Sequence, residues 1–162
     1  MKNMKIKSES EMLELGQKVA THLQLPAVIE LVGDVGAGKT TFTRGLAAGL
    51  GISGPVTSPS FTISKRYSFP IKRCNFYNTS SEQLSAGGEL VHYDFYRLGN
   101  PGIMRDELAE TLREPNSIVV VEWGGDVAEL LPEEHLRLDI TLNTDGSRDV
   151  TMNQSDFLEK LS

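Results

Sequence analysis

The segment Gly33-Asp34-Val35-Gly36-Ala37-Gly38-Lys39-Thr40 says most about the fold of this 162-residue chain. Its spacing is Gly-x-x-x-x-Gly-Lys-Thr, in which Gly36 and Gly38 let consecutive backbone N–H groups curl around phosphate oxygens. A helix beginning at about Gly38 would add the positive end of its dipole to the same place. The segment therefore predicts a loop that holds the phosphates of a nucleotide.

Three side chains at the end of this loop have separate expected contacts. Lys39 would reach the β- and γ-phosphates, the Thr40 hydroxyl would bind Mg²⁺, and Thr41 would touch the outer phosphates. Residues 28–32 precede the loop as a short apolar strand, and the following helix carries Phe42, Leu46 and Leu50 on one face. A glycine-rich turn that binds nothing is the alternative, and the lysine and two threonines argue against it.

The rest of the chain alternates strands and helices early and pairs strands antiparallel late. Expected helices cover 10–23, 38–50, 104–112 and a short turn at 126–131; expected strands cover 28–32, 61–67, 89–98, 117–122, 136–142 and 150–152. We therefore predict an α/β P-loop NTPase fold: a mixed sheet with a parallel core, an antiparallel edge hairpin, and helices on both faces. We expect one domain over 1–162, with a surface insert at about 68–88 that is rich in Ser, Asn and Gly.

Composition excludes several classes of protein. Charged residues make up 23% and hydrophobic ones 39%, and the net charge is −6. No apolar run reaches the roughly 18 residues that a membrane span needs. The single cysteine, Cys74, cannot form an internal disulfide, so we expect a cytoplasmic protein. We also expect it to be monomeric on its own. The basic group Lys65, Arg66, Lys72 and Arg73 is interpreted as a solvated loop rather than an RNA groove, because the chain is acidic.

Two carboxylates are candidates for holding the metal. Glu122 ends the apolar strand 118–121, as expected of a Walker B acid, and Asp94 lies in a segment dense in functional groups. We expect Glu122 on Mg²⁺ and Asp94 close to the metal or orienting the attacking water. The alternatives are a solvated strand end for Glu122 and a structural carboxylate paired with Arg97 or His92 for Asp94.

The segment Val56-Thr57-Ser58-Pro59-Ser60-Phe61 lies where NTPases place a loop that senses the γ-phosphate. Thr57, Ser58 and Ser60 offer hydroxyls in this loop, and we take Thr57 as the candidate catalytic one, with an ordinary turn as the alternative. Trp123 is equally compatible with a wall of the site and with the core. His92 is interpreted as a hydrogen-bonded structural residue rather than a catalyst.

Four segments together resemble the TsaE family, also called YjeE: residues 33–42, 56–61, 92–98 and 121–123. The resemblance implies a small bacterial ATPase that acts with the partner proteins TsaB and TsaD, and with tRNA through their complex. That complex places a threonylcarbamoyl group on the adenosine next to the anticodon, in tRNAs that read codons beginning with A. ATP hydrolysis, slow in the ATPase alone, would drive the cycle of the complex.

The resemblance also implies roles for particular residues. Thr40 and Glu122 would hold Mg²⁺, and Asp94 and Trp123 would be needed for turnover. The nucleotide contacts would include the helix start near 9–11 and the segment near 131–133. The residues expected to make them are Ser10, Glu11, Gly33, Gly36, Ala37, Gly38, Lys39, Thr40, Thr41, Trp123 and Pro132. The chain departs from the family in having Ser60 where Thr is usual, and in the length of 68–88.

Two other functions fit a phosphate-binding loop. A small metabolite kinase would need an arginine-rich lid, whereas Arg44, Arg66, Arg73 and Arg97 are scattered along the chain. A binding module that changes shape with nucleotide but turns over little is the second alternative.

Overall fold

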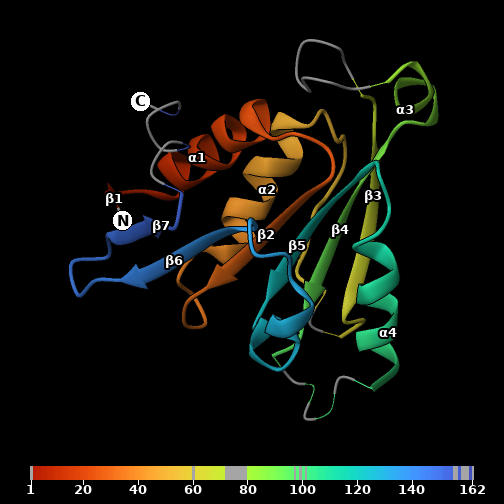
Figure 1. The fold of residues 1–162 in the computed structure, drawn as a ribbon. Helices are drawn as coiled ribbons and strands as arrows, with labels where there is room; N and C mark the ends of the chain where they lie inside the picture. Colours follow the sequence, from red (N-terminus) through yellow and green to blue (C-terminus); the bar gives the residue numbers. More distant parts are fainter. Residues whose placement is uncertain are drawn as a thin grey trace.

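The computed structural model describes residues 2–59, 61–71, 80–96, 98, 100, 102–154, 157 and 161. Within them, seven strands form one mixed sheet in the order β1-β7-β6-β2-β5-β4-β3 (Figure 1). The strands are β1 (Lys2–Ile6), β2 (Ala27–Val32), β3 (Ser64–Phe69), β4 (Gly88–Asp94), β5 (Ser117–Glu122), β6 (Leu136–Leu142) and β7 (Arg148–Met152). The helices are α1 (Glu9–His22), α2 (Lys39–Gly49), α3 (Ser81–Ala86), α4 (Gly102–Thr111) and the 3-10 helix η1 (Gly124–Leu130). None of the helices in the described part of the chain is both long and apolar enough to cross a bilayer.

The four central strands, β6, β2, β5 and β4, run parallel, so their carboxyl ends meet at one edge of the sheet. The loop after β2 lies at this edge. Asp94 and Glu122, the last residues of β4 and β5, are aligned with each other there. The parallel register therefore brings the two candidate carboxylates and the glycine-rich loop together.

Helices cover both faces of this sheet, as predicted. α1 and α2 lie side by side over one face, and α4 and η1 cover the other (Figure 1). All six residues of β5 are buried, which is typical of a parallel strand covered on both faces. Along β5, Ile118 and Val120 contact the core under α1 and α2, whereas Val119 and Val121 contact the core under α4.

Two glycines allow α1 to approach α2, the helix that follows the glycine-rich loop. A Cβ on Gly45 would lie 2.2 Å from the Leu13 carbonyl oxygen, and one on Gly16 would lie 2.4 Å from that of Phe42. No side chain fits at such distances. Ser8 caps α1 by accepting a hydrogen bond from the Glu11 N–H at 3.1 Å.

The strand β1 was missed by the sequence analysis, because Lys2–Ile6 is short and mostly polar. It pairs antiparallel with β7, so it forms the edge of the sheet next to the predicted hairpin of β6 and β7. The hairpin is confirmed, and its outer strand β7 lies one position inside the edge.

The expected insert at 68–88 carries more regular structure than its composition indicated. β3 begins at Ser64, three residues later than expected, and runs on to Phe69, while β4 begins at Gly88. Between them, α3 begins with a capping box in which Ser80 and Gln83 satisfy each other's backbone N–H groups, a signal the sequence analysis overlooked. No residue of α3 is buried, so this helix lies on the surface. Cys74, Lys72 and Arg73 lie outside the described residues.

Candidate functional site

The glycine-rich loop adopts a backbone conformation that favours glycine. Gly36 and Gly38 have φ of 84° and 113°, a left-handed region that favours glycine. Gly38 is also the N-cap of α2, and because it has no side chain, the first N–H groups of this helix receive no side-chain cap. Gly33 packs so tightly that a Cβ would lie 2.4 Å from the Ile140 carbonyl oxygen.

A cleft of about 360 Å³ lies over this loop at the carboxyl edge of the sheet. Most of the predicted site residues line it: Gly36, Gly38, Lys39, Thr40, Thr41, Asp94, Glu122 and Trp123. Further lining comes from Glu9, Met12, Val35, Ser58, Tyr96 and Arg148. Side chains from several separate segments thus converge on one cavity.

Lys39 lies deep in the cleft and is held by the loop itself. Its Nζ donates to the carbonyl oxygens of Gly33 at 2.7 Å and Asp34 at 3.0 Å, and lies 4.8 Å from the centre of the Trp123 ring. Trp123 has a left-handed backbone, with φ of 57°, and its ring lies 4.7 Å from that of Tyr96, centre to centre. The two rings form a wall beside the ammonium, which favours the interpretation of Trp123 as part of the site.

The two acids differ in their partners. Glu122 is buried, and its Oε1 lies 2.8 Å from Nε2 of His92, which is also buried. Asp94 accepts from the Ser58 hydroxyl at 3.1 Å and from the Tyr96 N–H at 3.0 Å. His92 therefore pairs with Glu122, and Arg97 lies outside the described residues.

The donors in the cleft fit a magnesium ion. Thr40, Asp94 and Glu122 present hard oxygen ligands in the same cavity. Mg²⁺ in nucleotide sites takes one or two protein oxygens, together with phosphate oxygens and water. A larger cluster of three or more carboxylate, imidazole or thiol groups that could hold a metal is absent from the described residues.

The serine-proline loop presents Ser58 to the cleft rather than Thr57. The Thr57 hydroxyl instead accepts a hydrogen bond from Lys65, a residue of β3. Lys65 and Arg66 lie on a strand and have specific partners, so their interpretation as part of a solvated loop is wrong. Ser60 lies outside the described residues.

Several expected nucleotide contacts are not among the residues that line the cavity. The carboxylate of Glu11 accepts the Lys7 N–H at 2.6 Å and so belongs to the start of α1, where Glu9 and Met12 reach the cleft in place of Ser10 and Glu11. Pro132 lines a different cavity beside His135. Gly33 and Ala37 contribute backbone carbonyls to Lys39 and Arg148.

Arg148 is a cleft residue that sequence reasoning missed. It extends from β7, where its Nε donates to the Ala37 carbonyl at 3.3 Å and its Nη1 to that of Gly146 at 3.1 Å. The alternation of β7 places it in phase with Val150 and Met152, both buried. A charged residue in phase with the buried face of a strand was the available signal.

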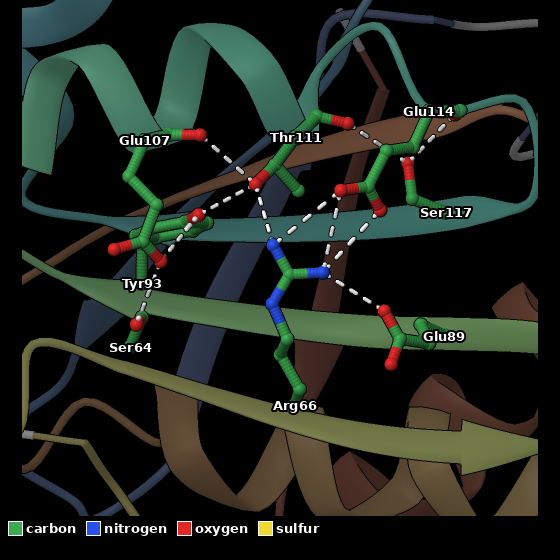
Figure 2. Close-up of polar contacts among 8 residues, drawn as sticks. All are labelled: Ser64, Arg66, Glu89, Tyr93, Glu107, Thr111, Glu114 and Ser117. Carbon is green, nitrogen blue, oxygen red and sulfur yellow. Dashed lines mark hydrogen bonds and ion pairs between the residues drawn. The ribbon is translucent and has the colours of Figure 1, made fainter.

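A polar network holds the strand that follows the serine-proline loop. Figure 2 shows Arg66 of β3 between the carboxylates of Glu89 and Glu114. Its guanidinium lies 2.8 Å from Glu89 and also donates to the hydroxyl of Thr111, the last residue of α4. Ser64 donates to Glu107 of α4 at 3.1 Å. The start of β3 is therefore tied to α4, next to Asp94, whose N–H donates to the carbonyl of Ile63 at 2.8 Å.

Comparison with known proteins gives a consistent result. Residues 6–150 match the family model of the threonylcarbamoyl adenosine biosynthesis protein TsaE. A relative from Streptomyces coelicolor, named tRNA threonylcarbamoyladenosine biosynthesis protein TsaE, is 40% identical over 80% of this chain and 78% of its own. The protein of the same name from Haemophilus influenzae is 32% identical over 87% and 82%.

A solved structure shares the fold. The crystal structure of Bacillus subtilis YdiB superimposes with a TM-score of 0.70 and 29% identity, covering 99% of this chain and 93% of that one. The family model, the relatives and the shared P-loop NTPase fold agree with the four segments noted in the sequence. This chain therefore belongs to the TsaE family of proteins of tRNA threonylcarbamoyladenosine biosynthesis.

Proposed function

We propose that this protein is a magnesium-dependent ATP hydrolase that drives the TsaB–TsaD complex as it forms threonylcarbamoyladenosine in tRNA. The observation that supports it is the convergence of Lys39, Thr40, Asp94 and Glu122 on one cleft above the glycine-rich loop. This is the set of groups that positions a triphosphate for transfer of its terminal phosphoryl group to water.

Each group has a distinct part in the proposed reaction. The backbone N–H groups of 36–41 and the Lys39 ammonium bind the phosphate oxygens and neutralise charge that develops on them. Thr40 and Glu122 would hold Mg²⁺, which would supply further positive charge to the phosphates. To bind phosphate, the Lys39 ammonium exchanges its bonds to the Gly33 and Asp34 carbonyls for bonds to the nucleotide.

Asp94 is the candidate group for orienting the attacking water. Its carboxylate is fixed on both sides, by the Ser58 hydroxyl and by the Tyr96 N–H. A carboxylate held in this way keeps one geometry through the reaction. Because Ser58 belongs to the serine-proline loop, movement of that loop would change the position of Asp94, which would let the γ-phosphate or a partner control turnover.

The family assignment and the charge of the chain support a role inside a complex. A net charge of −6 disfavours direct binding to the tRNA phosphate backbone, so contact with tRNA would come through TsaB and TsaD. The substrate would be the adenosine next to the anticodon in tRNAs that read codons beginning with A, in the cytoplasm.

The fate of the terminal phosphate tests the reaction type. ATP labelled at the γ-phosphate is incubated with the protein and Mg²⁺, alone and with TsaB, TsaD and tRNA. We expect the label to appear as inorganic phosphate, faster when the partners are present. Lys39→Met is the control, since it removes the phosphate-binding ammonium. Label on a small acceptor would identify a metabolite kinase, and bound ATP with unchanged label under all conditions would identify a nucleotide-dependent binding module.

A further inference from the structure

A buried histidine lies within hydrogen-bond distance of the candidate metal ligand Glu122. His92 lies on β4, two residues before Asp94 on the same face of the strand, and it is fully buried. Its Nε2 lies 2.8 Å from Oε1 of Glu122 on the neighbouring parallel strand β5. Glu122 also lines the cleft over the glycine-rich loop.

The second ring nitrogen fixes which proton His92 carries. Its Nδ1 is buried and has no hydrogen-bond partner among the described residues. An ionised carboxylate can only accept, so Nε2 must carry the proton that lies between the two groups. A protonated Nδ1 would be a buried donor without a partner among the described residues, which is costly. The geometry therefore places a proton on Nε2, which donates to Glu122.

We infer that His92 is a positioning residue for the metal site: it fixes the Glu122 carboxylate so that its remaining oxygen faces the cleft. This inference rests on the proposed metal-binding role of Glu122. A carboxylate at the end of a strand can rotate about its side-chain torsions, and fixing one oxygen by a hydrogen bond removes that freedom before the ion binds. Ligand-orienting bonds of this type typically change metal affinity by about 10–100-fold.

Three substitutions of His92 separate the hydrogen bond from the packing. In His92→Gln the amide nitrogen reaches about as far as Nε2, so the donor is kept. In His92→Asn the same amide is one methylene shorter and cannot reach Glu122, which makes it the matched control. In His92→Phe the ring shape is kept and the donor is lost.

The measurement is Mn²⁺ affinity, read from the electron paramagnetic resonance of free Mn²⁺ in the presence of protein and ADP. We expect His92→Phe and His92→Asn to weaken Mn²⁺ binding by about 10–100-fold, and His92→Gln to restore most of it. Affinity for ADP without metal should be unchanged, and it serves as the check on folding. If Phe disturbs that affinity, the comparison of Gln with Asn decides alone.

Two outcomes would overturn the inference: wild-type Mn²⁺ affinity in the His92→Asn protein, or equal losses in His92→Gln and His92→Asn. Glu122→Gln distinguishes this from failure of the proposed function. Unchanged Mn²⁺ affinity in Glu122→Gln would remove Glu122 from the metal site altogether. Weakened affinity in Glu122→Gln with none in His92→Asn would defeat only the positioning role of His92.

Discussion

The Lys39 ammonium lies 4.8 Å from the centre of the Trp123 ring while it donates to two carbonyls of the phosphate loop. A nucleotide phosphate would compete for this ammonium and alter the field at the indole. Trp123 is the only tryptophan in the chain, so tryptophan fluorescence reports on this place alone.

We therefore predict that ADP or ATP changes the tryptophan emission in proportion to nucleotide bound. In Lys39→Met the emission without nucleotide should itself differ from that of the wild type, because the cation is gone. Titration by fluorescence, compared with calorimetry on the same samples, checks both statements. If calorimetry shows that nucleotide saturates the protein while the emission stays unchanged, Lys39 keeps its contact with the ring and the first prediction is wrong.

Glu122→Gln is expected to separate binding from turnover. The loop N–H groups and Lys39 remain, so nucleotide affinity without metal should stay close to that of the wild type. Loss of a carboxylate ligand removes several kcal/mol of transition-state stabilisation, so phosphate release should fall by at least about a hundredfold. Glu129→Gln, which alters an exposed acid paired with Arg105, is the control and should leave both properties unchanged. Loss of all ATP affinity in Glu122→Gln would refute this division of roles.

Arg148→Ala is predicted to weaken nucleotide binding by about tenfold, the effect of removing one charge-assisted contact at a partly exposed site. Arg148→Lys should recover part of the loss, because it keeps the charge without the fork of N–H donors. The matched control is Arg105→Ala, since Arg105 bonds Glu129 and the Asp126 carbonyl instead of lining the cleft. Equal affinities for Arg148→Ala and wild type would exclude Arg148 from the nucleotide site.

Most of the fold could be predicted because the segments that build it have strong local signals. The glycine spacing, the apolar run 118–121 and the capping residue Ser8 each specify their own structure. Parallel strands then align their carboxyl ends, so Asp94 and Glu122 meet at the phosphate loop without further information.

What could not be predicted depends on contacts between distant segments. Thr57 and Ser58 are adjacent hydroxyls, and their partners lie on distant segments: Thr57 bonds Lys65, whereas Ser58 bonds Asp94 and faces the cleft. Arg148 reaches the loop from a strand that lies 111 residues beyond Ala37 in the chain. The strand β1 has little pattern of its own and forms because β7 offers it an edge.

Tyr93 links the buried network of Figure 2 to the stability of the protein. Its hydroxyl bonds Thr111 at 2.8 Å and Glu107 at 3.2 Å. Burial, assisted by the nearby Glu107 carboxylate, raises the pKa of Tyr93 to about 12 from 10.0. The folded state thus holds this proton more tightly than the unfolded state does.

Because the folded-state pKa is the higher one, the contribution of Tyr93 to stability is complete below about pH 10 and is lost as the pH rises from 10.0 to about 12. Tyr93→Phe should lose less stability than the wild type across this window, although it is less stable at neutral pH for want of the two hydrogen bonds. Urea unfolding at several pH values measures the difference. Parallel pH curves for the two proteins would contradict the raised pKa.

Gly45→Ala tests the close approach of α1 and α2. The added Cβ would lie 2.2 Å from the Leu13 carbonyl oxygen, so the helices must separate. We expect a loss of about 1–3 kcal/mol in the free energy of unfolding, and weaker nucleotide binding because α2 follows directly on the phosphate loop. Gly125→Ala, where an added Cβ would meet nothing within 4 Å, is the control for the substitution itself. Equal stability of the two variants would show that the helices can separate freely.

The central proposal is that ATP hydrolysis in the cleft above the glycine-rich loop drives the modification of tRNA, with Glu122 as a ligand of the magnesium ion. The most direct measurement is multiple-turnover formation of threonylcarbamoyladenosine by TsaB and TsaD from a labelled threonylcarbamoyl donor, with tRNA in excess. Wild-type protein with ATP is predicted to sustain repeated turnover, whereas Glu122→Gln with ATP should allow no more than the first round. Sustained modification in the presence of the Glu122→Gln protein would contradict the proposal.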